Sequence, residues 1–202
     1  MNVALALLWK DLLCEWRSRD RVVAMIVFSI LVVVVFQFAW PDRTPEQTRA
    51  LAPGVLWVIY LFAELLGIGR TFTAELENDA MTALALAPGT RGWIFAGKAA
   101  ASFVLIAGVQ ALTAGVFALL FRVDLSPAIG ALALVVGLAD VAICSVGTLF
   151  SAMSVRSRFR EVLLPVLLIP SLIPVLAAAV QATTAVIGGE PLTLAAAQPL
   201  IV

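Results

Sequence analysis

Long apolar runs separated by short polar segments are the feature that most constrains this chain. The first run extends from Val22 to Trp40, and its only polar residues are Ser29 and Gln37. An α-helix rises about 1.5 Å per residue, so this run reaches about 28 Å, close to the hydrocarbon thickness of a bilayer. The run therefore predicts a transmembrane helix that ends at Pro41.

Further apolar runs follow, at about Gly54–Gly69, at Trp93–Phe121, up to about Met153, and at Val162–Thr183. The segment from Pro41 to Gly54 is polar and broken by proline, which is typical of an exposed loop. After Pro191 the chain is apolar up to Val202, too short a stretch to cross a bilayer. With 62% hydrophobic residues and a mean hydropathy of +1.07, we expect an all-α integral membrane protein, a bundle of about six transmembrane helices whose sixth is truncated.

Several functional classes are disfavoured by composition. The chain has no histidine, the commonest metal ligand and general base, and only two cysteines, Cys14 and Cys144. We therefore expect no catalytic residue and no metal site. Its net charge is zero, so the basic surface of a nucleic-acid-binding protein is absent. No G-x-x-x-x-G-K-[ST] phosphate cradle occurs, so we expect no nucleotide to bind this chain.

The distribution of positive charge predicts how the chain is oriented. If the N-terminus is cytoplasmic, only Arg43, Arg49 and Arg122 of the 13 Lys and Arg residues lie on the far side. Such a bias matches the positive-inside rule. The polar segment from Arg70 to Lys98 then lies in the cytoplasm.

The first twenty residues predict an amphipathic helix at the cytoplasmic membrane surface. The apolar side chains follow helical spacing, namely Leu5, Leu8, Trp9, Leu12, Leu13 and Trp16. The other face carries Lys10, Asp11, Glu15, Arg17 and Ser18. Such a helix lies in the interface with its tryptophans at headgroup depth. Two roles are open for this helix. It is either a plain lipid anchor, or an anchor that also contacts a cytoplasmic partner.

The segment from Arg70 to Lys98 predicts a second short helix. Thr73 can cap it, Glu75, Glu77 and Asp79 fall in its first turns, and Pro88–Gly89 ends it. An apolar stripe runs along it, formed by Leu76, Ala80, Leu84 and Ala87. This helix is either a solvated loop element or a coupling helix that docks on an ATPase. The predicted coupling interface consists of Glu75, Glu77, Asp79, Met81 and Leu84.

Polar side chains inside the predicted spans form a second candidate site. Asp140 lies near the middle of the fourth run, and an ionised carboxylate there costs roughly 2.5–3.5 kcal/mol on insertion scales. Gln110 in the third run is a plausible hydrogen-bond partner, and Glu64 lies in the second run. These groups either hold helices together or form a polar seam that moves during transport. Three prolines, Pro165, Pro170 and Pro174, predict a kinked fifth span.

Residues spread along most of the chain resemble a known family. They are Lys10–Asp11–Leu12, Glu15, Arg17, Gly54, Leu56, Trp57, Arg70, Phe72, Glu75, Leu84, Ala87, Pro88, Lys98, Gly147–Thr148, Arg160–Glu161, Leu163–Leu164–Pro165, Pro170 and Pro174. Together they resemble the haem exporter protein B (CcmB) family, the ABC-2-like permeases of cytochrome c maturation.

The resemblance implies one permease domain over residues 1–202, with an interfacial helix at 1–20 and a coupling loop at 70–92. It implies a multi-pass protein of the bacterial inner membrane, for which a homodimer is one expected assembly. Its partners would be a CcmA-like ATP-binding subunit and CcmC-like and CcmD-like haem-handling subunits. ATP hydrolysis on the partner would drive haem export or release of a haem-loaded chaperone.

Without histidine the chain supplies no imidazole to haem iron, so we expect haem to be ligated by partner subunits and no cofactor to bind directly. The alternative function is an ion-coupled secondary transporter that uses Asp140 and Glu64, although no inverted repeat is evident. No nucleophile motif or paired-acid signature favours a membrane-embedded enzyme.

Overall fold

The computed structural model describes residues 3–42, 44–72, 75–76, 90–155, 157 and 159–189. These residues form α-helices joined by short connections, with no strand in the described ranges. The helices are α1 (Val3–Ser18), α2 (Asp20–Ala39), α3 (Pro45–Gly69), α6 (Arg91–Phe121), α7 (Ile129–Ser154) and α8 (Arg160–Ile187), with a short 3-10 turn η1 (Ser126–Ala128) before α7. Five of them, α2, α3, α6, α7 with η1, and α8, are long and apolar enough to cross a membrane. The prediction of an all-α membrane protein is confirmed.

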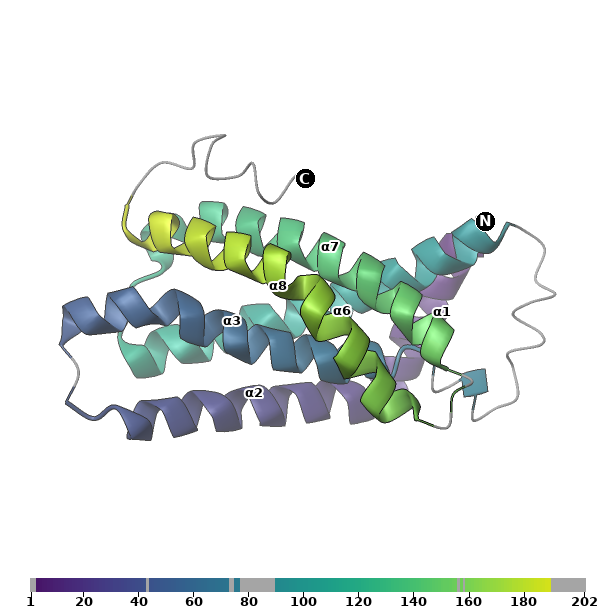
Figure 1. Cartoon of the computed structure of the whole chain (residues 1–202), viewed down its shortest axis with the longest axis horizontal. Helices are drawn as coiled ribbons and strands as arrows, with labels where there is room; N and C mark the ends of the chain where they lie inside the picture. The colour runs from purple at the N-terminus through teal and green to yellow at the C-terminus, as the bar shows by residue number, and fades with distance from the viewer. Residues whose placement is uncertain are drawn as a thin grey trace.

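Helix α3 is the centre of the bundle. It packs against α2, α6, α7 and α8, and it is the most buried of the five membrane-crossing helices. Figure 1 shows α2 along one edge of the bundle and α7 and α8 along the other, with α3 between them. Because α3 touches every other crossing helix, polar side chains on α3 can reach several helices at once.

The bundle has two ends that differ in structure. At one end, which we call the α1 end, α1 crosses the direction of the other helices (Figure 1). The end of α3 and the start of α6 also lie there. The opposite end carries the connection from α2 to α3, the turn from Arg122 to Ser126, and the end of α8 at Ile187.

The start of α3 differs from the predicted loop. The helix begins at Pro45, well before Gly54. Thr44 forms a capping box: its Oγ1 accepts a bond from the Gln47 backbone N–H at 3.3 Å, and Gln47 Oε1 accepts one from the Thr44 N–H at 3.0 Å. Proline is well tolerated in the first helical turn. The prediction of a loop up to Gly54 was wrong because it counted Pro45 and Pro53 as breakers and missed this cap.

Helix α8 contains all three prolines that predicted a kink, Pro165, Pro170 and Pro174. Each lacks the N–H that would bond to the preceding turn. Figure 1 shows α8 changing direction partway along its length. The kink is therefore confirmed. Two other expectations, the helix from Thr73 to Ala87 and a sixth span after Pro191, fall largely outside the described residues; of the former only Glu75 and Leu76 are described, and both are helical.

Helix α1 crosses α6 at very close range, and a glycine permits the contact. A Cβ added at Gly97 would lie 2.8 Å from the carbonyl oxygen of Ala4 and 3.0 Å from Cβ of Leu7. The first neighbour is backbone, which cannot swing aside as a side chain does. Only a residue without Cβ lets the two helices approach this closely.

Gly97→Ala is therefore expected to push α1 away from α6. Overpacking of this kind costs typically about 1–3 kcal/mol. A nitroxide spin label on Cys14, an exposed residue of α1, should become more mobile in the variant. The matched control is Gly108→Ala on the same helix, where an added Cβ meets nothing within 4 Å. Equal label mobility in the two variants would contradict the close crossing.

Candidate functional site

Four charged side chains meet at the α1 end and form what we call the junction cluster: Lys10, Asp11, Glu75 and Lys98. Nζ of Lys98 lies 2.7 Å from Oε1 of Glu75 and 2.9 Å from Oδ2 of Asp11. Lys10 completes the cluster by pairing with Glu75 and with Asp11. Two cations therefore balance two anions, and they join α1, the segment after α3, and α6.

Lys98 is the centre of this cluster. Its side chain is only 1% exposed, and Glu75 is 2% exposed. An ammonium group has three donors, and Nζ of Lys98 also donates to the backbone oxygen of Thr71 at 3.1 Å. All three donors thus have partners, and the Phe72 ring centroid lies 5.2 Å from Nζ. A buried charge needs this degree of pairing to be tolerated.

The pKa values of Glu75 and Lys10 follow from these contacts. Burial alone would raise the pKa of Glu75, but hydrogen bonds and charges from Lys10 and Lys98 outweigh it, so the pKa falls below its ordinary 4.5. Burial alone would lower the pKa of Lys10, but bonding to Glu75 and the charge of Asp11 outweigh it, so the pKa rises above its ordinary 10.5. Both shifts favour the charged forms.

The attachment of α1 should therefore depend on pH only at the extremes. The contribution of Glu75 is complete above pH 4.5 and is lost as pH falls through its lowered folded pKa. The contribution of Lys10 is complete below pH 10.5 and is lost as pH rises through its raised folded pKa. Mobility of the Cys14 label should be flat between these values and rise outside them. Lys10→Gln should remove the alkaline change and keep the acid one; a change centred near neutral pH would contradict the assignment.

Two acidic residues of the predicted polar face of α1 bond to other parts of the protein. Asp11 turns toward the protein to reach Lys98, and Oε1 of Glu15 accepts a bond from the backbone N–H of Val22 at 3.0 Å, at the start of α2. Arg19 between α1 and α2 adopts a left-handed conformation with φ 59°. The expectation that Asp11 and Glu15 lie on a free polar face is corrected, because the turn at Arg19 folds α1 back against the bundle.

The predicted apolar face of α1 divides into two parts. Leu8 and Leu12 are half-buried against the bundle. The large side chains that remain well exposed form a stripe: Leu5, Trp9, Leu13 and Trp16. The cations Lys10 and Arg17 lie beside this stripe and are exposed. A helix with such an exposed stripe suits a membrane surface.

The structure describes only one member of the predicted coupling interface. Glu75 is buried and bonded to Lys98, so it does not present its carboxylate outward as a docking acid would. Its neighbour Leu76 is 37% exposed. The remaining predicted members, Glu77, Asp79, Met81 and Leu84, lie outside the described residues, and their role stays a prediction.

Three polar side chains of the membrane-crossing helices meet and form what we call the polar seam: Glu64 of α3, Gln110 of α6 and Asp140 of α7. Nε2 of Gln110 donates to Oε1 of Glu64 at 2.8 Å and to Oδ1 of Asp140 at 3.0 Å. All three are at most 1% exposed. The prediction that Gln110 bonds to Asp140 is confirmed, and the same amide group also holds Glu64.

A third buried polar group was not predicted. Nη2 of Arg21 donates to Oγ of Ser102 at 3.2 Å, and Ser102 is in turn 3.2 Å from Oγ1 of Thr71. Lys98 was noted as a positive charge and as a residue of the family resemblance, but not as a buried group. The sequence does contain evidence that both side chains are buried and paired. Arg21 and Lys98 border or interrupt apolar runs, and an ionisable residue there requires a partner.

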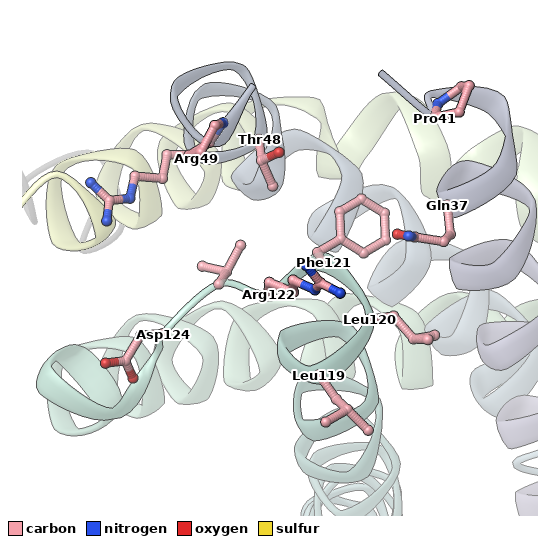
Figure 2. Close-up of a pocket in the computed structure, with 11 residues that line it drawn as sticks. Gln37, Pro41, Thr48, Arg49, Leu119, Leu120, Phe121, Arg122 and Asp124 are labelled. Carbon is pink, nitrogen blue, oxygen red and sulfur yellow. The ribbon is translucent and has the colours of Figure 1, made fainter. Parts of the chain in front are cut away.

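A cavity of about 630 Å³ at the opposite end contains Arg49 and Arg122 in its lining. Figure 2 shows that the two guanidinium groups point away from each other. Asp124 is occupied by its own turn, where it accepts bonds from the N–H and hydroxyl of Ser126. The charged groups of this cavity therefore do not converge on one point.

Comparison with known proteins settles the family. The model of the family described as CcmB protein matches residues 2–200. The chain belongs to the CcmB family. Two relatives named heme exporter protein B support this: that of Bradyrhizobium diazoefficiens is 31% identical over 94% of this chain and 84% of the relative, and that of Paracoccus denitrificans is 30% identical over 93% and 86%. The heme exporter protein B of Pseudomonas aeruginosa is 27% identical, again over 94% of this chain.

Membership of the CcmB family confirms the resemblance found in the sequence. Lys10, Asp11, Phe72, Glu75 and Lys98 were among the residues that carried it. In the structure these residues, far apart in sequence, meet at the junction cluster.

Proposed function

We propose that this chain is the permease subunit of an ABC-type complex that exports haem or releases a haem-loaded chaperone in cytochrome c biogenesis. The observation that carries the proposal is the family match over residues 2–200, on a bundle whose described residues include five helices able to cross a membrane. The relatives' name, heme exporter protein B, supports haem as the cargo. ATP would be hydrolysed on a CcmA-like partner, and this chain would perform no catalysis itself.

The junction cluster supplies a route by which movement of a partner could reach the crossing helices. Lys98 belongs to α6, yet it is bonded to Asp11 of α1 and to Glu75 in the segment after α3. A displacement of that segment would pull on α6 through a buried ion pair rather than through a solvated loop. By the positive-inside rule we place this end in the cytoplasm, where an ATP-binding subunit would dock.

The wider assembly follows from the same proposal. Residues 1–202 would act as one permease domain in the bacterial inner membrane, with α1 resting on the cytoplasmic lipid surface. CcmC-like and CcmD-like subunits would handle haem, and two copies of this chain would serve a pair of ATP-binding subunits. Because the chain has no histidine, partner subunits would supply an imidazole to haem iron.

Co-expression with the ATP-binding subunit encoded by the same organism tests the proposal. The two proteins should co-purify in detergent, and cells lacking this chain should lose covalent haem attachment to c-type cytochromes. Charge reversal at Glu77 and Asp79 should weaken co-purification, whereas Glu46→Lys at the opposite end should not. Normal cytochrome c maturation in cells without the chain would overturn the proposed function.

One observation favours an ion-coupled transporter as a second candidate. Glu64 and Asp140 are both fully buried within crossing helices, as the ion-binding acids of such transporters are. Transport by vesicles that contain only this chain, driven by an ion gradient without ATP, would support this second candidate. Transport or maturation that requires the ATP-binding partner would exclude it.

A further inference from the structure

The polar seam holds more hydrogen-bond acceptors than donors. Two carboxyl groups and one amide oxygen provide five acceptor atoms, whereas the side-chain NH₂ of Gln110 provides two donors. Both donors are used, one for each acid. Three oxygens remain buried without a partner, Oε2 of Glu64, Oδ2 of Asp140 and Oε1 of Gln110.

The neighbouring hydroxyl of Tyr60 does not correct this shortage. It donates to the backbone oxygen of Gln110 at 3.2 Å and is therefore already used. Buried polar groups are nearly always paired, and an unpaired one costs about 1–3 kcal/mol, more for a charged group. Two ionised carboxylates held by one neutral amide would leave a double negative charge in the bundle. The seam therefore lacks hydrogen-bond donors, and the simplest source of one more donor is a proton bound to a carboxyl group.

We propose that the Glu64–Gln110–Asp140 seam is a proton-binding site, in which the two carboxyl groups hold at least one exchangeable proton at neutral pH. Like charges at one site disfavour ionisation of both groups, as in other carboxyl pairs. A protonated acid becomes a donor to one of the unpaired oxygens. The site goes beyond the proposed permease function, because it assigns the seam a ligand of its own.

A cavity between α6 and α7 gives the site a path to the opposite end. It has a volume of about 570 Å³, and its lining extends from Phe103 past Gln110 and Asp140 to Asp124–Ser126 near the opposite end. Its lining includes several small residues, among them Gly115 and Gly137, where an added Cβ would meet nothing within 4 Å. Glu64 does not line the cavity. Asp140 is therefore the group that meets an entering proton first, with Glu64 behind it.

The surroundings contain few other titratable or charged groups. Tyr60 of α3 and Cys144 of α7 interact electrostatically with both acids, and Arg21 of α2 interacts with Cys144. From α6 the seam is met by the neutral amide of Gln110. Between α3 and α8, Nε1 of Trp57 donates to Oγ1 of Thr183 at 2.9 Å, and both groups are neutral. No described cation pairs with either acid, which leaves the proton as the neutralising ligand.

Infrared spectroscopy of the purified full chain in lipid nanodiscs tests the proposal. The C=O stretch of a protonated carboxylic acid should be present at neutral pH and should shift in D₂O. It should disappear in the Glu64→Gln, Asp140→Asn double variant. The matched control is Glu46→Gln, an exposed acid on the same α3 helix, which should leave the band unchanged. Retained helical circular dichroism shows that each variant is folded.

The cavity between α6 and α7 leads to a separate prediction about the rate of proton exchange. Gly137→Leu should fill the cavity, slow the D₂O shift of the band, and leave the band position unchanged. Absence of the band in the unmodified chain, or its persistence in the double variant, would overturn the proton site. A band that appears only when Na⁺ and K⁺ are removed would also overturn it, because the ligand would then be a metal cation. None of these measurements requires ATP or a partner, so the proposed function is tested independently.

Discussion

Lys98→Met is expected to destabilise the protein by about 3–5 kcal/mol and to release α1 from the bundle. Methionine has nearly the same length but no charge, so Glu75 and Asp11 would lose their buried shared partner and keep only Lys10. Removing one member of a buried ion pair costs this much when the other member stays buried, and Glu75 would keep only the half-exposed Lys10 as its counter-charge. Glu75 is 2% exposed, so its carboxylate would be left with little contact with water. The unfolding midpoint in mixed micelles should fall, and a spin label on Cys14 should become mobile.

Two variants control for simple loss of packing. Lys10→Met removes the other cation of the cluster, which is 45% exposed, so its effect should be much smaller. The triple variant Lys98→Met, Glu75→Gln, Asp11→Asn removes both stranded charges and should recover most of the stability. If Lys98→Met and Lys10→Met have equal effects, Lys98 is not the centre of the cluster.

Gln110→Leu is expected to have the second-largest effect. It removes the amide group that donates to both Glu64 and Asp140. Each buried acceptor left without a partner costs about 1–3 kcal/mol, so the loss should exceed that of one ordinary interhelical bond, which is often below about 1 kcal/mol. A lower thermal unfolding temperature in nanodiscs should reveal it.

A companion variant separates the hydrogen bonds from the volume of the side chain. In the background Glu64→Leu, Asp140→Leu, the change Gln110→Leu should cost little, because no acid remains to be stranded. A double-mutant cycle over these variants measures the interaction energy. Equal effects of Gln110→Leu in both backgrounds would show that the seam contributes packing rather than hydrogen bonding.

Much of the fold could be predicted from apolar length and charge bias, because both are properties of local sequence. The run from Val22 to Trp40 predicted α2 to within a few residues, and the three prolines predicted the bend of α8. The start of α3 was missed although its signal was local. Thr44 and Gln47 have capping-box spacing, but the neighbouring prolines were given more weight.

The candidate sites could be predicted only in part. Asp140 and Gln110 drew attention because a polar group in an apolar run needs a partner, and two such groups on different helices are natural candidates. Glu75 was predicted to face outward because it begins an acidic helical turn. Its burial depends on Lys98, more than twenty residues later, and on Lys10, in another helix; local periodicity contains no information about such distant partners.

The sequence by itself determined that this chain is an all-helical membrane protein of the CcmB family, since hydrophobic length and spaced family residues are readable without coordinates. Which of its charged side chains are buried and paired was decided only by the tertiary structure. Asp11, Glu75 and Lys98 look like separate surface charges in the sequence, yet the crossing of α1 over α6 at Gly97 brings them into one buried cluster. The physical reason is that a buried charge is tolerated only beside its counter-charge, and helix packing determines which counter-charge lies within reach.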